Sequence, residues 1–303
     1  MTPISAVTTT SRRLIAVAAS TRFWRNSKVK VAAIQMRSGL DPEANLRALE
    51  PLLAEAAAQG AQYALTPEVT MIFPENREQL RSVAASFEGH PQLAAVGELA
   101  QQHGMFVQMG SLPIPLEDGR FANRSVLFGP GGQQVATYDK IHLFDADIAG
   151  LNAYRESATY RGGDVAVTAD LGEFTLGFAI CYDMRFPRLF NALANAGANL
   201  IAVPAAFTVP TGQAHWHVLL RARAIETGSY VIAAAQGGTH QNGRATYGHS
   251  LIIDPWGKVI AELDHDEPGV LVSEIDAAAV IEARGRVPAL ANARDFAVPS
   301  SKR

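Results

Sequence analysis

The spacing of apolar residues along the chain predicts an alternation of strands and helices. Val29–Gln35 is an apolar run with the length of a strand. Between residues 46 and 56, apolar residues recur every three or four positions, as on the buried face of a helix. Asp41 and Pro42 suit the N-cap and first turn of that helix, and Gly60 suits its end. The fold is therefore expected to begin with a strand followed by a helix.

The same alternation continues through the rest of the sequence. Strands are predicted over Tyr63–Leu65, Met105–Gly110, Phe174–Ile180, Leu200–Val203, Tyr230–Ala235 and Val270–Ile275, and helices over Pro91–His103, about Pro187–Ala196, about Gln213–Thr227 and Ala277–Arg284. Glycine-rich turns at residues 129–132 and 254–257 predict two hairpins, so the sheet should be mixed. This pattern indicates an α/β fold with helices covering the sheet. No shift in composition divides residues 29–295, which we predict to be one domain.

The two ends of the chain lie outside the predicted domain. Residues 1–30 contain no acidic residue and are rich in Ser, Thr and Arg. We expect residues 1–28 to be a disordered N-terminal extension and residues 296–303 to be a short C-terminal tail.

Composition argues against several classes of function. The chain has 303 residues, of which 48% are apolar, so it can bury a large core. Charged residues make up 18% and the net charge is −3, which does not fit a nucleic-acid-binding surface. No apolar run is long enough to span a bilayer. We therefore expect no nucleic-acid partner and no membrane partner.

The chain contains a single cysteine, Cys181, at the end of the apolar run Phe174–Ile180. One thiol cannot form an intramolecular disulfide, which favours a reducing, cytoplasmic location. A lone cysteine is usually a small buried apolar residue. However, open α/β sheets place their ligands at the carboxyl ends of strands, and a strand-to-helix turn offers N–H groups to an oxyanion. Cys181 is therefore a candidate nucleophile, on a turn that Asp183 and Arg185 are expected to brace.

Two other polar residues follow apolar strands. Glu68 comes after the predicted strand Tyr63–Leu65, and Lys140 comes after the second strand of the first hairpin. A cysteine nucleophile needs a base or a cation to favour the thiolate. Taken singly, the glutamate would more often be a surface residue and the lysine a solvated one.

Three motifs together resemble the signature blocks of the nitrilase superfamily, the carbon–nitrogen hydrolases. The motifs are Thr66-Pro67-Glu68, Tyr138-Asp139-Lys140-Ile141-His142-Leu143-Phe144 and Ile180-Cys181-Tyr182-Asp183-Met184-Arg185-Phe186-Pro187. Their order and separations also fit, and the resemblance continues through blocks between residues 204 and 257. It covers nearly everything after residue 30, and a match over several blocks is far more specific than one motif.

The resemblance implies a four-layer α-β-β-α sandwich of mixed sheets flanked by helices, and a cysteine-dependent amidase. Glu68 would take the proton of Cys181 and later activate water. The acyl group of the substrate would be bonded to the Cys181 sulfur as a thioester between the two steps. Lys140 and the backbone N–H of Tyr182 would stabilise the oxyanion. Glu156, sixteen residues after the lysine as in the relatives, would position the lysine and the substrate. No metal ion or organic cofactor is implied, and a homodimer or higher homo-oligomer is expected.

Within the superfamily the chain most resembles the branch of deaminated glutathione amidases and ω-amidases. This implies a small carboxylate-bearing amide substrate: deaminated glutathione, cleaved to 2-oxoglutarate and cysteinylglycine, or alternatively α-ketoglutaramate. Phe207 and Thr208 are expected to line its pocket, and His215 either lines the pocket or packs a subunit interface. Arg244, in a glycine-rich loop, is the candidate cation for a substrate carboxylate. The pair Arg223 and Glu226 is expected to be a structural ion pair.

Two rival functions remain open. The first is another nitrilase-type hydrolase that acts on nitriles or N-carbamoyl compounds, because the same triad serves these reactions. The second is a catalytically silent interaction protein, against which the presence of Glu68, Lys140, Glu156 and Cys181 argues.

Overall fold

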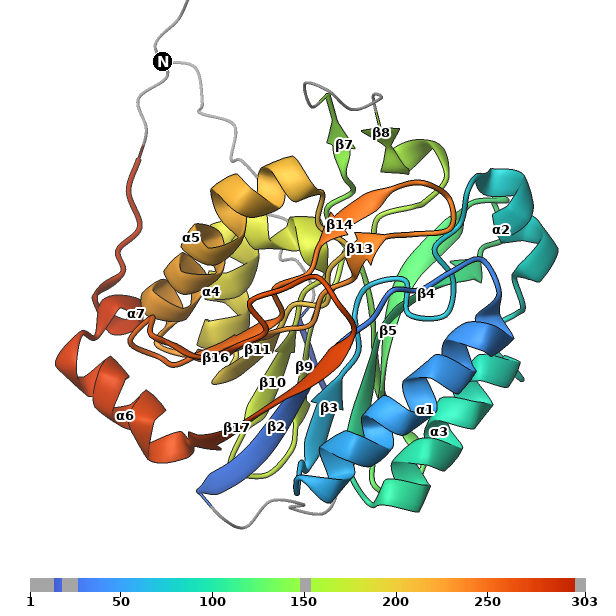
Figure 1. Cartoon of the computed structure of the whole chain (residues 1–303). Coiled ribbons are helices and arrows are strands. Elements are labelled where there is room, and N and C mark those ends of the chain that lie inside the picture. The colour runs from blue at the N-terminus through green and yellow to red at the C-terminus, as the bar shows by residue number, and fades with distance from the viewer. Residues whose placement is uncertain (1–13, 18–26, 148–153, 298–303) are drawn as a thin grey trace, which may run out of the picture.

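The computed structural model describes residues 14–17, 27–147 and 154–297, and these residues form two large β-sheets with helices on their outer faces (Figure 1). None of the helices in these ranges combines the length and the apolar character needed to cross a bilayer.

The first sheet has six strands in the spatial order β17–β2–β3–β4–β5–β6. Their bounds are β17 Gly269–Asp276, β2 Lys28–Gln35, β3 Tyr63–Leu65, β4 Phe106–Pro115, β5 Phe121–Phe128 and β6 Gln134–Asp139. Neighbours pair in parallel from β2 to β4 and antiparallel elsewhere, so the sheet is mixed as predicted. This pairing makes β3 and β6 run in the same direction, and their carboxyl ends therefore lie at the same edge.

The second sheet has seven strands in the order β1–β9–β10–β11–β12–β15–β16. Their bounds are β1 Leu14–Val17, β9 Ala166–Asp170, β10 Thr175–Phe178, β11 Leu200–Ala202, β12 Tyr230–Ala233, β15 Leu251–Ile253 and β16 Val259–Glu262. The central strands β10, β11 and β12 are parallel, and their carboxyl ends meet the edge at which β3 and β6 end. Two short pairs border this region: β7 (Asp145–Ala146) with β8 (Tyr154–Arg155), and β13 (Gly237–Thr239) with β14 (Ala245–Tyr247).

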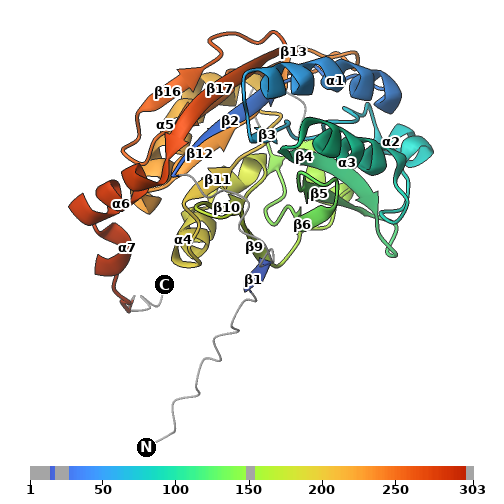
Figure 2. The ribbon, with the colours of Figure 1, turned by 90° about the horizontal axis from the view of Figure 1, so that it is seen from below.

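Helices cover the outer face of each sheet (Figure 2). Helices α1 (Pro42–Ala58) and α3 (Pro91–His103) pack on the first sheet, and α4 (Pro187–Asn195) and α5 (Val209–Thr227) pack on the second. The remaining helices are α2 (Arg77–Val83), η1 (Glu156–Ala158), η2 (Cys181–Arg185), α6 (Ala277–Arg286) and α7 (Ala289–Asn292). The layers are thus helix, sheet, sheet and helix, which confirms the fold class expected from the sequence.

The alternation of side chains along β2 shows how one strand serves both cores. Val31 and Ala33 are fully buried in the core between the two sheets. Ala32 and Ile34 are fully buried in the core between the first sheet and its helices. Successive residues of a strand point to opposite faces, so a strand buried on both faces is a continuous apolar run. Each large aliphatic side chain buried in this way contributes about 1.5–3 kcal/mol.

The structure differs from the predicted elements in several places. Strand β4 continues to Pro115 across a β-bulge after Met109, where two prolines had masked the strand pattern. Strand β9, helix α2, the short pairs β7–β8 and β13–β14, and helix α7 were not predicted, because none of them has a clear apolar repeat. The N-terminal extension predicted to be disordered contains β1, whose apolar residues Leu14–Val17 pair in parallel with the open edge of β9. The rest of that extension, and most of the predicted C-terminal tail, lies outside the described residues.

Candidate active site

Cys181 lies at the tight turn that follows β10, as the first residue of η2. Its backbone φ is +47°, a left-handed conformation that costs a non-glycine residue about 1–3 kcal/mol. The backbone N–H of Cys181 donates to the carbonyl of Pro204 at 2.8 Å, which ties the turn to the chain just after β11. The side chain is 8% exposed and opens into a cavity. The turn therefore presents the thiol at the carboxyl end of a buried strand.

Asp183 braces this turn from below, as the sequence indicated. Its fully buried carboxylate accepts hydrogen bonds from the Tyr138 hydroxyl at 2.7 Å and from the backbone N–H of Ile180 at 2.9 Å. It also accepts from the backbone N–H of His142 at 3.0 Å and lies 2.7 Å from His142 Nδ1. These contacts join the Cys181 turn to the segment around Lys140, so the two sheets are linked directly beneath the site.

Lys140 lies between two buried carboxylates. Its Nζ donates to Glu68 Oε1 at 2.8 Å and to Glu156 Oε1 and Oε2 at 3.0 and 2.9 Å. Lys140 is 2% exposed, Glu156 4% and Glu68 5%. Ions removed from water at this depth persist only when they are paired and hydrogen-bonded. The three side chains therefore form one electrostatic unit.

Backbone and amide groups hold the two carboxylates in place. Glu68 Oε2 accepts from the backbone N–H of Ala206 at 3.0 Å, and Glu156 Oε2 accepts from that of Phe144 at 2.6 Å. Asn123, in the middle of β5, donates through Nδ2 to both glutamates, at 3.0 and 3.2 Å. The two carboxylates thus keep a fixed orientation towards Lys140, although one follows β3 and the other lies in η1.

The electrostatics of the cluster set the protonation states. Burial raises the pKa of the Cys181 thiol well above its usual range and the Glu68 charge raises it further, against the lowering effect of Lys140. Burial alone would raise the pKa of Glu68, but the charge and hydrogen bond of Lys140 lower it overall. Burial alone would lower the pKa of Lys140, but the charges of Glu156 and Glu68 raise it. At neutral pH the cluster therefore holds a carboxylate base, an ammonium ion and a protonated thiol.

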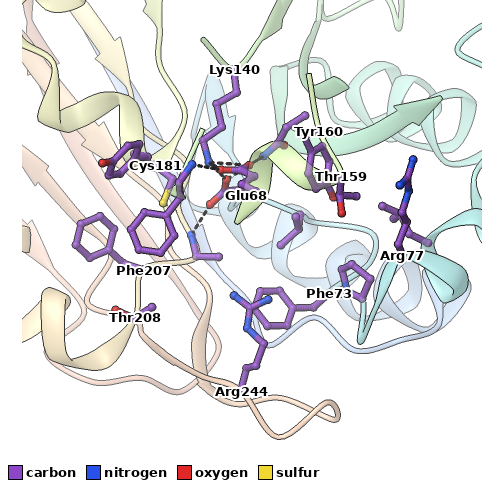
Figure 3. A pocket seen from close by; sticks show the side chains of 18 of the residues that line it. Glu68, Phe73, Arg77, Lys140, Thr159, Tyr160, Cys181, Phe207, Thr208 and Arg244 are labelled. Carbon is purple, nitrogen blue, oxygen red and sulfur yellow. Dashed lines mark hydrogen bonds and ion pairs between the residues drawn. The ribbon is translucent and has the colours of Figure 1, made fainter. Parts of the chain in front are cut away.

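The cluster forms the inner end of a cavity (Figure 3). Four residues expected at the site, Tyr182, Phe207, Thr208 and Arg244, line this cavity. Arg244 follows the hairpin turn before β14, and its guanidinium lies over the ring of Phe73, 4.6 Å from the centroid. Other lining residues come from the outer side of the cavity and include Glu75, Arg77, Leu80, Thr159 and Tyr160.

His215 does not line the cavity, which corrects one of the two expectations for this residue. Its exposed side chain lies on the outer side of α5, with Nδ1 3.3 Å from Arg185 Nη2. In the same helix Gly212 and Trp216 are buried, and a helical residue next to an inward-facing one points about 100° away. The prediction followed closeness in sequence and ignored the face of the helix.

Asn123 and Arg77 are among the cavity residues that were not predicted, and both carry hydrogen-bonding side chains. Asn123 stands inside β5 and not at its end, and the two residues that follow it are also polar, so no apolar strand pattern marks it. Arg77 begins the short helix α2, which has no clear apolar repeat. The expected ion pair between Arg223 and Glu226 is present at 2.7 Å and lies outside the cavity lining. Among the described residues, no group of three or more His, Cys, Asp or Glu side chains is placed to hold a metal ion.

Comparison with known proteins gives concordant results for sequence and structure. Residues 30–285 match the family model described as carbon-nitrogen hydrolase. A deaminated glutathione amidase of Yersinia enterocolitica is 39% identical over 267 residues, covering 87% of this chain and 92% of the relative. The C. elegans NitFhit protein is similar in structure, with a TM-score of 0.81, 33% identity, and coverage of 89% of this chain and 66% of that one.

An amidase from Nesterenkonia sp. AN1 is also similar in structure, with a TM-score of 0.70 and 27% identity. The match covers 87% of this chain and 96% of the amidase. In that structure the acetamide moiety of fluoroacetamide is bonded covalently to the active-site cysteine.

Proposed function

The chain belongs to the carbon–nitrogen hydrolase family, and on that premise we propose that it is a cysteine-dependent amidase that hydrolyses deaminated glutathione. The observation that carries the mechanism is the buried unit of Lys140, Glu68 and Glu156 beside the Cys181 thiol. A buried ammonium between two carboxylates is costly to assemble, and perturbed groups of this kind cluster at functional sites.

Acylation begins with proton transfer from Cys181 to Glu68. The raised pKa of the thiol and the lowered pKa of Glu68 keep the proton on sulfur until the substrate is in place. The sulfur then attacks the amide carbonyl carbon to give a tetrahedral intermediate. When this intermediate collapses, the C–N bond breaks and Glu68 returns the proton to the departing nitrogen. The amine leaves, and the acyl group remains on Cys181 as a thioester.

Deacylation uses the same base. Glu68 takes a proton from a water molecule as its oxygen attacks the thioester carbon. The C–S bond breaks, the sulfur regains a proton, and the free carboxylic acid leaves. One water molecule is consumed for each amide bond hydrolysed, and the protein returns to its starting protonation state.

Both tetrahedral intermediates carry a negative oxygen that needs donors. We assign this role to the Lys140 ammonium and to the backbone N–H of Tyr182, the second residue of η2. The first N–H groups of a helix lack intrahelical acceptors, so they can donate to a ligand. Both carboxylate oxygens of Glu156 accept hydrogen bonds from Lys140 Nζ. Glu156 therefore acts as a positioning residue for the ammonium group.

The identity of the substrate rests on the relatives and on the cavity. The Yersinia enterocolitica relative is named deaminated glutathione amidase, as are relatives from cyanobacteria and mammals. Deaminated glutathione carries a carboxylate on each side of its scissile amide. Arg244 offers a cation for the 2-oxo acid end, and Phe207 and Thr208 supply the wall beside Cys181.

We further propose a homodimer in a reducing, cytoplasmic compartment. Val218 and Ile225 on the outer side of α5 and Trp256 in the adjacent turn are 67%, 54% and 57% exposed. Large apolar side chains that cluster on a surface favour burial against another molecule. A second copy of the chain is the simplest partner for them, and a single reactive thiol is preserved best where the environment is reducing.

The function is tested by assaying the purified protein with deaminated glutathione and with α-ketoglutaramate in parallel. We expect release of 2-oxoglutarate and cysteinylglycine from the first substrate with the higher kcat/KM, and no release by Cys181→Ser. A higher kcat/KM for α-ketoglutaramate would make the protein an ω-amidase instead. Inactivity on both, together with failure of iodoacetamide to label Cys181 selectively, would contradict the amidase proposal.

A further inference from the structure

Arg77 lines the outer part of the cavity, on the side away from Cys181 (Figure 3). It is the first residue of α2, and its Nη2 donates to the carbonyl of Gly119 at 3.0 Å. That bond fixes the guanidinium against the turn between β4 and β5. Arg77 Nε is buried, and no described residue accepts a hydrogen bond from it. A guanidinium N–H left in this state is costly unless a ligand accepts from it.

The charges around the cavity distinguish Arg77 from the other cations. Lys140 is matched by the carboxylates of Glu68 and Glu156. Arg77, in contrast, forms no ion pair with any carboxylate in the described part of the chain. Glu75 also lines the cavity, but it is exposed to solvent at the rim. The outer cavity therefore contains an anchored guanidinium that no carboxylate of the described residues pairs with.

From this placement we propose that Arg77 binds the carboxylate of the leaving amine, at the glycine end of deaminated glutathione. The assignment rests on the proposed function and adds to it the residue that recognises the dipeptide half of the substrate. An arginine carries five N–H donors and binds carboxylates well, and the single bond to Gly119 leaves the other donors of the Arg77 guanidinium for a ligand.

The direction of the leaving group follows from the chemistry at Cys181. Glu68 returns its proton to the departing nitrogen, so the leaving amine lies on the Glu68 side of the sulfur. In Figure 3, Glu68 lies between Cys181 and Arg77, with Thr159 and Tyr160 along the way. An extended dipeptide that starts at Glu68 therefore points towards Arg77, whereas a leaving ammonia molecule would not reach it.

The test compares wild-type enzyme with Arg77→Met, and uses Arg81→Met as the matched control. Arg81 lies one turn later on α2, is exposed, and does not line the cavity. Three substrates are needed: deaminated glutathione, its analogue with the glycine carboxylate converted to an N-methylamide, and α-ketoglutaramate, which lacks the dipeptide. Melting temperatures of all three proteins show whether the variants are folded.

We expect Arg77→Met to lower the kcat/KM ratio of deaminated glutathione to α-ketoglutaramate by about 10- to 100-fold, mainly through KM. The wild type should lose a similar factor on the N-methylamide, and Arg77→Met should no longer distinguish acid from amide. Arg81→Met should keep the wild-type ratio. An unchanged ratio in Arg77→Met, or continued preference for the carboxylate, would overturn the assignment of Arg77. Failure of the wild type to hydrolyse deaminated glutathione would instead remove the proposed function itself, and with it this inference.

Discussion

Replacing Lys140 by methionine is the most informative perturbation of the site. Methionine has a similar length but no charge, so it removes three hydrogen bonds from Nζ to Glu68 and Glu156 with little change in packing. Two carboxylates then face each other in a space where each is at most 5% exposed. Removing one partner of a buried ion pair leaves the other charge uncompensated, and this is more costly than the loss of the pair as a whole.

The expected effects on turnover and on stability are separate. Loss of one oxyanion donor costs about 3–4 kcal/mol of transition-state stabilisation, so kcat should fall by about 10²- to 10³-fold. The uncompensated carboxylates should cost about 3–5 kcal/mol of folding free energy, and lower the melting temperature by on the order of 10 °C. Most domains have more stability than this, so Lys140→Met should remain folded at 25 °C.

The double variant Lys140→Met with Glu156→Gln provides the control. It removes one of the two facing charges, so it should melt at a higher temperature than Lys140→Met alone while remaining inactive. Thermal unfolding and single-turnover release of 2-oxoglutarate measure the two effects. A Lys140→Met enzyme within tenfold of the wild-type turnover would refute the role assigned to the lysine. A double variant less stable than Lys140→Met would refute the electrostatic account of the cluster.

Three further predictions concern the groups around the thiol. Burial raises the pKa of Glu68, but Lys140 outweighs burial and lowers this pKa below its ordinary value of 4.5. The stability from the ion pair is therefore fully present above pH 4.5, and it is lost only as the pH falls through the lowered pKa. Melting temperature and kcat/KM should therefore show no acid limb between pH 8 and about 5, and a limb centred near pH 6 would contradict this. Asp183→Asn places an amide where the carboxylate accepts several hydrogen bonds. The variant should lose about 2–4 kcal/mol of folding free energy and react more slowly with an alkylating agent at Cys181. Unfolding and alkylation rates equal to those of the wild type would show that the turn does not need this carboxylate. Asn123→Ala removes a donor shared by two carboxylates and should lower kcat by about tenfold, with the fold intact by circular dichroism. An unchanged kcat would mean that Lys140 and the backbone N–H groups of Ala206 and Phe144 position the carboxylates without Asn123.

Glu68, Lys140 and Cys181 share one property: each follows the end of an apolar strand, and the carboxyl ends of parallel strands meet at one edge of a sheet. The resemblance to the nitrilase superfamily placed the three residues in one site, and the structure brings them together. Asn123 does not follow this rule, because its strand runs past the site and the side chain reaches it from the middle. Its role depends on which strands are neighbours in the sheet, and the local sequence does not predict that order.

Short elements and helix faces limited the remaining predictions. The pairing of β1 with β9 joins residues about 150 positions apart. A run of four apolar residues does not indicate which distant strand it pairs with. Arg77 was overlooked because α2 is short and buries only Leu80. His215 was misplaced because it follows residues of the pocket wall in sequence but faces away from them on α5. In each case the missing information is tertiary, since it concerns contacts that local spacing does not fix.

The pairing of β17 with β2 has a consequence for biosynthesis. These strands join Gly269 with Gln35 and Asp276 with Lys28, so the first strand of this sheet meets its outer neighbour only after nearly the whole chain has left the ribosome. Until then β2 presents an unpaired edge to other nascent chains, which is a route to aggregation. Polypeptides terminated before residue 269 should therefore accumulate in inclusion bodies, whereas termination after residue 286 leaves this edge covered.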